Sequence, residues 1–168
     1  MPDDAGHKYA KTLAFRPACP QGDASLLIAF ARDLYCESLG SDAEFRRDYG
    51  AYGEKFPLWI AACIGADPGF AVLLIEEGAA IGLTVLGISR RKALGHVHHF
   101  YIVPERRGRG FGGLLDDYAR CTLGRAGASR ARLNVTPGNA RAIRFYLAQG
   151  WQKTPRAASR LINMEVAL

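Results

Sequence analysis

The stretch Phe100-Tyr101-Ile102-Val103-Pro104-Glu105-Arg106-Arg107-Gly108-Arg109-Gly110-Phe111-Gly112-Gly113-Leu114-Leu115 places a glycine-dense turn between an apolar run and a helix-like segment. Glycines let the backbone approach a ligand closely and adopt dihedral angles that other residues avoid. The first N–H groups of the following helix have no partner within the helix, so they point outward with the positive end of the helix dipole behind them. This stretch therefore predicts a strand, a tight turn and a helix start that together bind a phosphate-bearing molecule.

Around this turn, the sequence predicts short strands and helices in a mixed order. Glu77-Gly78 joins two strand-like runs into a hairpin. Asp23 and the capping-box pattern Ser41-Asp42-Ala43-Glu44 each predict the start of a helix before that hairpin. The expected strands are residues 12–16, 70–76, 80–89, 94–103, 131–135, 151–153 and 161–166, and further helices are expected over residues 58–64, after Gly113 and after Asn139. This order predicts an α+β domain with a mixed, mostly antiparallel central sheet flanked by helices.

The composition is typical of a globular protein with one domain. Its 168 residues, 49% of them hydrophobic, suffice for a sizeable core. We expect a flexible tail over residues 1–10 and a single domain over residues 11–168. The acidic start Met1-Pro2-Asp3-Asp4 lacks the apolar segment of a signal peptide, and no window reaches the ~18 apolar residues of a membrane span. These features predict a cytoplasmic protein that has no membrane partner.

The four cysteines are scattered along the chain and form no C-x-x-C pair. This spacing argues against a zinc site and against a disulfide framework, so we expect no metal and a reducing compartment. Cys19, Cys36, Cys63 and Cys121 are expected to be small buried hydrophobes.

The net charge of +6 is unevenly distributed. Residues 1–100 carry 10 Lys+Arg and 12 Asp+Glu, whereas residues 101–168 carry 12 Lys+Arg and 4 Asp+Glu. The basic second half, which contains the glycine turn, suits a polyanionic ligand. The mildly acidic first half favours a cationic one.

Two common phosphate-binding motifs fit poorly. Gly108, Gly110 and Gly113 match the G-x-G-x-x-G spacing of dinucleotide-binding folds, but that fold needs an acidic residue ~20 positions further on to hold the ribose. Residues 118–164 contain no Asp or Glu, and hairpin strands precede the turn where a first βαβ unit would be required. A P-loop is excluded because no Gly-Lys-Ser/Thr follows the glycines.

The sequence does not favour nucleic acid as a partner. The pI of 9.4 suits phosphates, but the arginines fall on several predicted elements rather than on one face. No helix-turn-helix, zinc finger or aromatic–glycine RNA motif is present. A solvated basic surface accounts for these arginines.

The chain resembles the GNAT N-acetyltransferases from about Leu13 to the C-terminus, most strongly over residues 100–151. The turn fits the family pattern Q/R-x-x-G-x-G/A, and the opening Phe15-Arg16-Pro17-Ala18 with Asp23 resembles the family's first strand and helix. A second family signature, N-x-x-A-x-x-F-Y-x-x-x-G-F/W, is matched by Asn139, Ala142, Phe145, Tyr146, Gly150 and Trp151. The two motifs in this order imply the GNAT fold, with acetyl-CoA as cosubstrate.

The resemblance also implies which residues bind coenzyme A. Backbone amides of the glycine turn would hold the pyrophosphate, and nearby arginines would add charge, with solvated arginines as the alternative. The family's splayed strand edge corresponds to Phe100, Tyr101 and Ile102. There, backbone groups would pair with the pantetheine arm, and an N–H near Ile102 would stabilise the oxyanion. Asn139 matches a residue that hydrogen-bonds the pantetheine region, or else it caps a helix. The cofactor-binding candidates are Phe100, Tyr101, Ile102, Arg107, Gly108, Arg109, Gly110, Phe111, Gly112, Gly113 and Asn139.

Tyr146 matches the family's general acid, which protonates the departing thiolate. A tyrosine pKa of about 10 lies above the thiol's value of about 8.5, so the side chain keeps its proton until it is needed. The alternative is that Phe145 and Tyr146 are two core aromatics, and core packing is the role that we expect for Phe145.

The general base is not given by the motif. Certain family members carry a Glu five residues before the Asn, whereas this chain has Asn134, which accepts no proton usefully. His98, on the strand leading to the site, is the first candidate and Glu76 the second, with a relay through water as a third route. Alternation predicts that His96 and His98 share a face with Phe100 and Ile102, while His99 faces the other side.

These observations predict an acetyl-CoA-dependent N-acetyltransferase that moves the acetyl group directly to a primary amine of a small molecule or peptide. The acceptor would lie between the first two helices and the ends of the central strands, in a pocket that Tyr35, Tyr49, Tyr52 and Trp59 could line. A catalytically weak CoA-binding or partner-recognition domain of the same fold is the alternative, because the Glu is missing. The sequence leaves open the acceptor's identity and whether the chain forms a homodimer.

Overall fold

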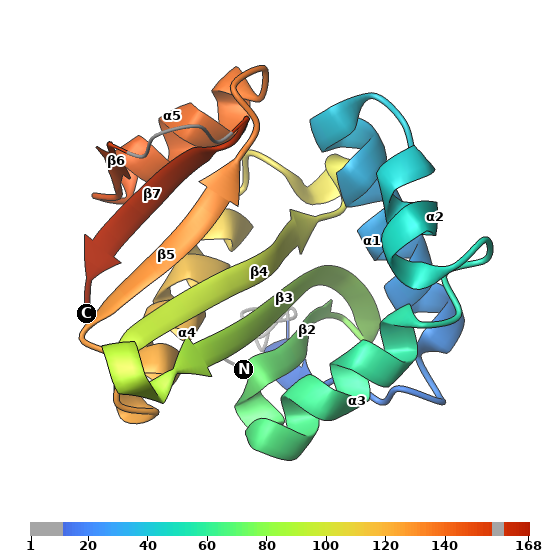
Figure 1. The fold of residues 1–168 in the computed structure, drawn as a ribbon. Helices are drawn as coiled ribbons and strands as arrows, with labels where there is room; N and C mark the ends of the chain where they lie inside the picture. Colours follow the sequence, from blue (N-terminus) through green and yellow to red (C-terminus); the bar gives the residue numbers. More distant parts are fainter. Residues whose placement is uncertain (1–11, 156–159) are drawn as a thin grey trace, which may run out of the picture.

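The computed structural model describes residues 12–155 and 160–168, so the expected tail over residues 1–10 lies outside the described residues. Over these residues, a seven-stranded sheet runs in the order β1-β2-β3-β4-β5-β7-β6 (Figure 1). Its neighbouring strands are antiparallel except for β4 and β5, which are parallel. The strands are β1 (Leu13–Pro17), β2 (Ala71–Glu76), β3 (Ala79–Ser89), β4 (Leu94–Ile102), β5 (Arg130–Val135), β6 (Gln152–Thr154) and β7 (Ile162–Ala167). The predicted mixed, mostly antiparallel sheet is confirmed.

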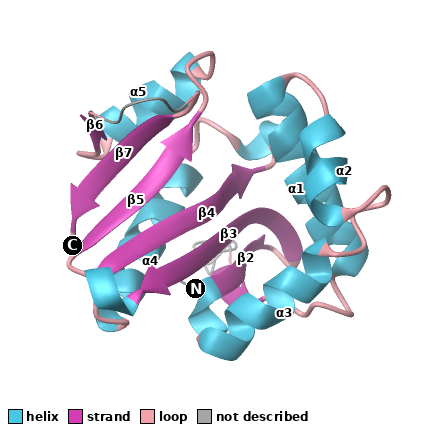
Figure 2. Ribbon diagram, in the orientation of Figure 1, coloured by secondary structure: helices cyan, strands magenta, loops and turns pink. Residues whose placement is uncertain are grey.

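Helices cover both faces of this sheet (Figures 1 and 2). One core joins the first three helices to β2 and β3 through side chains such as Leu27, Phe56 and Leu83. A second core joins the last two helices to β5 and β7 around the buried Trp151. The helices are α1 (Ala24–Leu39), α2 (Ala43–Tyr49), α3 (Phe56–Ala66), α4 (Phe111–Arg125) and α5 (Ala140–Ala148), with short 3-10 turns at Pro68–Phe70, Arg90–Lys92 and Pro104–Arg106.

The ends of the first three helices differ in detail from expectation. Asp23 precedes α1, but its carboxylate accepts hydrogen bonds from Arg16 and the Cys19 amide instead of capping the helix. The residue that precedes α2 is Asp42 rather than Ser41. Helix α3 extends beyond the expected range of residues 58–64 at both ends. It ends before Pro68, because the residue that precedes a proline is driven out of the helical region.

A β-bulge at His98 interrupts the pairing of β3 with β4. Val85 pairs with His99 and Leu86 pairs with Val97, which leaves His98 as the extra residue. The ring of His98 lies over Gly87, where an added Cβ would come within 2.7 Å of its Nε2. The bulge resets the alternation of side chains along β4.

Strands β4 and β5 pair only at their beginning. Leu94, Gly95 and His96 pair with residues 130–132, and no pairing continues to the end of either strand. The later part of β4, residues 97–102, therefore presents a backbone edge toward β5 without a neighbouring strand. Helix α4 begins next to this opening.

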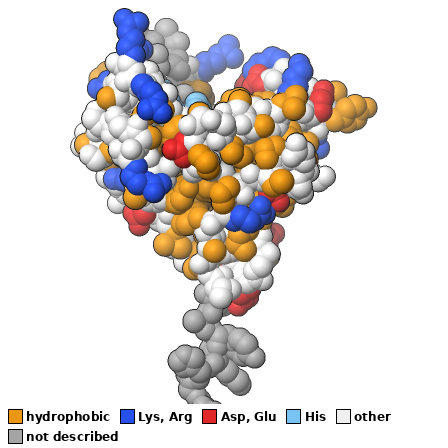
Figure 3. Space-filling view, turned by 90° about the horizontal axis from the view of Figure 1, so that it is seen from below, with side chains coloured by type: hydrophobic (Ala, Val, Ile, Leu, Met, Phe, Trp, Pro, Cys, Tyr) orange, Lys and Arg blue, Asp and Glu red, His pale blue; other side chains and the backbone are white. Residues whose placement is uncertain are grey.

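Cysteines and apolar side chains both lie on the surface of the protein. Cys19, Cys36 and Cys121 are exposed and Cys63 is half-buried, so the expectation of four buried cysteines was wrong. These positions fall on outward sides of their elements. Apolar side chains also gather near the centre of the face seen from below, with basic side chains around them (Figure 3). Among the described helices, none has the length and apolar character required to cross a membrane.

Candidate functional site

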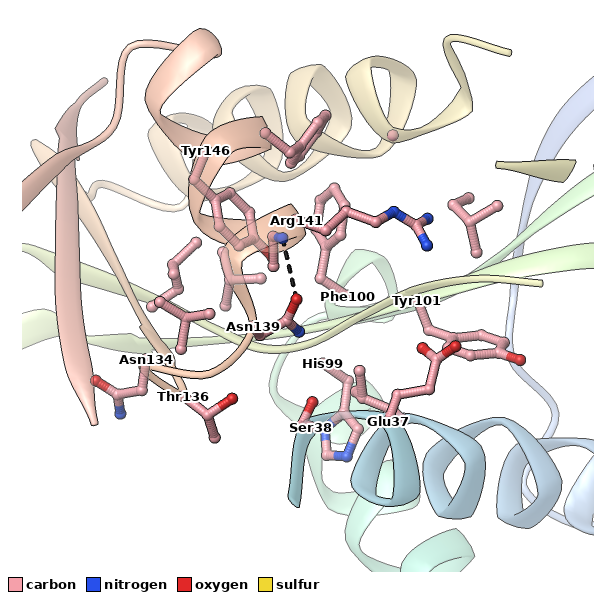
Figure 4. A pocket seen from close by; sticks show the side chains of 18 of the residues that line it. Glu37, Ser38, His99, Phe100, Tyr101, Asn134, Thr136, Asn139, Arg141 and Tyr146 are labelled. Atoms are coloured by element: carbon pink, nitrogen blue, oxygen red, sulfur yellow. Dashed lines mark hydrogen bonds between the residues drawn. The ribbon is translucent and has the colours of Figure 1, made fainter. Parts of the chain in front are cut away.

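A cavity of about 880 Å³ lies at the opening between β4 and β5. Helices α1 and α2 line one end of it, and the start of α4 together with α5 lines the other. Figure 4 shows Glu37 and Ser38 of α1 on one side of β4, with Tyr146 and Arg141 of α5 on the other. The cavity therefore collects residues from most of the elements that the two sequence motifs mark.

The glycine turn forms one wall of the cavity. Gly110 precedes α4 with a φ of +87°, a left-handed conformation that favours glycine. The first helix-type bond recorded here is from the Leu114 amide to the Gly110 carbonyl, so no acceptor within the described residues satisfies the amides of residues 108–113. Gly112 lets α4 pack closely on α5, because an added Cβ would lie 2.9 Å from Phe145. The turn thus presents a row of unpaired N–H groups, as expected for an anion site.

The last three residues of β4 line the cavity, and the side chain of each also packs against a neighbouring element. The Phe100 ring packs against Phe145 and Tyr146, each with a centroid separation of 5.6 Å. Tyr101 turns toward α1 and donates a hydrogen bond to Asp33. Ile102 packs in the core below α4. The edge of β4 that lacks a neighbouring strand leaves backbone groups at the opening, although the Ile102 carbonyl accepts a hydrogen bond from Arg107.

The two arginines of the turn differ in their surroundings. Arg107 lines the cavity, but its guanidinium is bound bidentately by Glu37 (Nη2 to Oε2, 2.8 Å) and donates to the Ile102 carbonyl at 2.6 Å. Arg109 is exposed and is not among the lining residues. A cation that the motifs did not mark, Arg141, lines the cavity instead and forms no ion pair with any residue that the structure describes. Its position just after Asn139 was the signal that could have identified it.

Tyr146 lies at the inner wall of the cavity. It is buried against Phe100, Phe145 and Trp151, and no hydrogen-bond partner for its hydroxyl is found within the described part of the chain. Burial, followed by the nearby Asp116 carboxylate, raises the pKa of Tyr146 well above its usual value. The phenol therefore stays protonated at neutral pH.

The Asp116 carboxylate binds two side chains near Tyr146. It accepts hydrogen bonds from the Trp151 indole N–H at 2.8 Å and from Arg120 Nε at 2.7 Å. No motif in the sequence marks this buried carboxylate.

Two polar residues of the loop between β5 and α5 line the cavity. Asn139 caps α5, because its side-chain oxygen accepts from the Ala142 amide at 3.1 Å (Figure 4). The helix-cap reading of Asn139 is therefore correct, while its side-chain N–H₂ group is not used by the cap. Thr136 also lines the cavity, and its buried hydroxyl has no hydrogen-bond partner in the described part of the chain. No motif in the sequence marks Thr136.

The histidines of β4 do not follow the predicted alternation. His98 stacks on His96 at a centroid distance of 5.8 Å, and both His98 and His99 contact the ring of Trp59 on α3. The prediction that His98 shares a face with Phe100 was wrong, because the bulge turns His98 toward the side of His99. His99 does lie on the face opposite Phe100, as predicted. His98 and His99 both line the cavity on the α1–α3 side of β4, opposite Phe100.

Both cavity histidines have lowered pKa values, although the His98 residue is exposed and His99 is buried. Desolvation lowers the pKa of His98 to about 4, with a further contribution from His96. It lowers the pKa of the fully buried His99 to about 3. Glu76, the second candidate base, is buried at the end of β2, where it pairs with Arg106 at 2.6 Å, and it is not among the cavity residues.

The sequence matches the acetyltransferase (GNAT) family over residues 29–151. Because this match covers most of the chain, the protein belongs to the GNAT acetyltransferase family, whose members are acyltransferases.

Solved structures share the fold at low sequence identity. PaiA N-acetyltransferase from Thermoplasma acidophilum, in complex with coenzyme A, is 19% identical with a TM-score of 0.77 over 94% of this chain and 99% of that one. Ribosomal-protein-alanine N-acetyltransferase from Brucella melitensis is 18% identical with a TM-score of 0.73 over 92% and 99%. yncA from Salmonella typhimurium, with its cofactor acetyl-CoA, is 15% identical with a TM-score of 0.72 over 93% and 94%.

Proposed function

We propose that this protein transfers an acetyl group from acetyl-CoA directly to a primary amine. The amine nitrogen attacks the thioester carbonyl carbon, the C–S bond breaks, and the sulfur leaves as a thiolate that takes up a proton. The products are an acetamide and free coenzyme A, and the amine loses one proton. No acetyl-enzyme is formed, because no cysteine lines the cavity beside a histidine.

The residues of the cavity fit acetyl-CoA. The unpaired amides of the glycine turn suit the pyrophosphate, and the open space beside Gly108, Gly110 and Gly113 admits it. The edge of β4 suits the pantetheine arm, which has amide groups of its own. Arg141 supplies a positive charge near the phosphates. When bound, acetyl-CoA supplies the activated acyl group.

Tyr146 acts as the general acid in this proposal. Its raised pKa keeps the proton on the phenol at the working pH, and Tyr146 lines the cavity with no competing hydrogen-bond partner for its hydroxyl among the described residues. The backbone N–H near Ile102 stabilises the oxyanion that forms when the amine attacks. Both groups act on atoms next to the C–S bond that breaks.

The proton of the incoming ammonium group has to leave before attack. Bringing an amine of pKa ~10.4 to its neutral form at pH 7 costs about 4–5 kcal/mol. His98 is neutral at that pH, so it can accept a hydrogen bond from the amine and pass the proton to water. Its lowered pKa makes it a relay to solvent rather than a strong base.

The single observation that carries this proposal is that one cavity is bordered by the glycines of the turn, by the unpaired edge of β4 and by Tyr146. Millimolar acetyl-CoA should raise the melting temperature, because it binds the folded state preferentially. An amine panel should then release free thiol from acetyl-CoA. A melting temperature that moves with NADH but not with acetyl-CoA would overturn the proposal. Stabilisation by acetyl-CoA without thiol release from any amine would instead favour a CoA-binding domain without catalysis, the alternative that Asn134 keeps open.

A further inference from the structure

The two ends of the cavity differ in charge. The end formed by α4 and α5 carries unpaired backbone N–H groups and Arg141. The end formed by α1 and α2 carries three carboxylates, from Glu37, Glu44 and Asp48. Charges of one sign that line a cleft attract ligands of the opposite sign. Glu37 adjoins the phosphate-binding turn through its ion pair with Arg107, whereas Glu44 and Asp48 lie on α2, on the side where the acceptor would enter.

The three carboxylates are not equally available to a ligand. Glu37 is occupied by the bidentate ion pair with Arg107. Glu44 and Asp48 lie one turn apart on α2 and share one cation, Arg47, at 3.5 Å and 3.2 Å. The Arg47 side chain is 67% exposed and is not among the lining residues. Two carboxylates thus face the cavity while a single solvated guanidinium screens them.

His99 gives an independent indication that this end of the cavity suits a polar ligand. Its side chain is only 4% exposed, it lines the cavity, and neither ring nitrogen has a hydrogen-bond partner among the residues that the structure describes. The rings of Phe56 and Trp59 pack against it and offer no acceptor or donor to those nitrogens at their faces. Buried polar groups in folded proteins are nearly always paired, so this imidazole calls for a polar partner from the cavity side.

Tyr35 links His99 to the acidic end. Its ring lies 6.2 Å from the His99 ring, and its hydroxyl donates to Asp48 at 3.3 Å. Figure 4 shows His99 below β4 beside Ser38 and Glu37 of α1. A neutral imidazole accepts an N–H bond without repelling a positive charge. His99, Tyr35 and Asp48 therefore suit a ligand that carries N–H groups and a positive charge.

We propose that the acceptor is a small molecule with two amino groups, of which one is acetylated while the other is held as an ammonium ion by Glu44 and Asp48. This inference rests on the proposed acetyl transfer, and it adds the chemical class of the acceptor. The second ammonium group takes no part in bond making. Its role is to anchor the substrate so that the first amine reaches the opening between β4 and β5.

The test compares amines of equal length that differ only at the far end: cadaverine, pentylamine and aminovalerate. Wild-type protein should use cadaverine with a kcat/KM about tenfold above that of pentylamine, with aminovalerate poorest, since each half-exposed ion pair contributes up to about fivefold. Glu44→Gln and Asp48→Asn should each lower kcat/KM for cadaverine by about threefold to fivefold through KM, and leave pentylamine unchanged. Asp117→Asn, which removes an exposed carboxylate of α4 outside the cavity, should change neither.

Calorimetric titration of cadaverine and pentylamine without acetyl-CoA separates this inference from the proposed reaction. Tighter binding of cadaverine, lost in Asp48→Asn, supports the diamine site even if no amine releases thiol, an outcome that would sink only the reaction. Equal kcat/KM and equal affinity for the two amines overturn the diamine site. So does an Asp117→Asn effect as large as that of Asp48→Asn. An unchanged melting temperature and acetyl-CoA affinity in each variant establishes that the variants fold.

Discussion

Replacing His99 with phenylalanine should make the folded state less sensitive to acid. His99 is buried among the rings of Tyr35, Phe56 and Trp59, and its one titratable neighbour of the same kind is His98. Its pKa is about 3 in the folded chain against 6.5 for an unperturbed histidine. Between these two values the unfolded chain binds the proton and the folded chain does not. The contribution of His99 to stability is therefore fully present above pH 6.5 and is lost as the pH falls.

The size of the effect follows from these two pKa values. At about pH 7.5 the difference in proton binding is negligible, and at about pH 5 it amounts to about 2 kcal/mol of lost unfolding free energy. His99→Phe removes this loss and also removes two unpaired nitrogens, so the variant should be at least as stable as wild type at about pH 7.5.

Urea unfolding of both proteins at the two pH values gives the comparison. Wild type should lose about 2 kcal/mol more than His99→Phe between them. His96→Phe is the matched control, since that side chain is half-buried on the same strand and should change the pH dependence less. Equal losses in wild type and His99→Phe would refute the reasoning, because they would mean that the folded state protonates His99 or finds a partner for it.

Three further predictions concern the site. Tyr146→Phe should lower kcat about a hundredfold and leave acetyl-CoA binding unchanged, as read from single-turnover kinetics and a thermal-shift titration; equal loss of both would mean a structural role. The pH profile of kcat/KM should lack a step near 6.5 and rise toward the amine pKa of ~10.4, because the pKa of His98 is about 4. His98→Ala should remove only a step near that lower value, and an unchanged profile would show that His98 is not the proton relay. Gly110→Ala should cost about 1 kcal/mol of stability, because the φ of Gly110 is +87°. It should also weaken acetyl-CoA binding more than the control Gly124→Ala, whose added Cβ points into open space on α4. Equal effects on binding would argue against the backbone amides of the turn as the phosphate site.

The sequence predicted the parts of this fold that depend on local patterns. The hairpin at Glu77-Gly78, the strand before the glycine turn and the helix after Asn139 were all marked by residues whose backbone preferences are strong. Their positions are those of β2 and β3, of β4 and of α5. The residues of the two motifs border one cavity because the fold brings the ends of β4 and β5 next to the two helix starts.

What the sequence could not predict depends on three-dimensional neighbours. The bulge at His98 is an extra residue opposite Val85 and Leu86, and no residue pattern around it indicates the shift in register. The ion pair of Arg107 with Glu37 joins residues 70 positions apart, so a residue expected at the phosphates is directed toward α1. Tertiary pairing of this kind leaves no local periodicity to read.

The separation of β4 from β5 has a consequence for how such a protein can diverge. The edge that opens there is made of peptide groups, which every amino acid carries, so substitutions along it alter the packing behind the strand without removing its hydrogen-bonding groups. The helices at the other end of the cavity, by contrast, present side chains. Substitutions in α1 and α2 can therefore change which acceptor is bound. The backbone groups that would bind the acyl donor are kept through such substitutions.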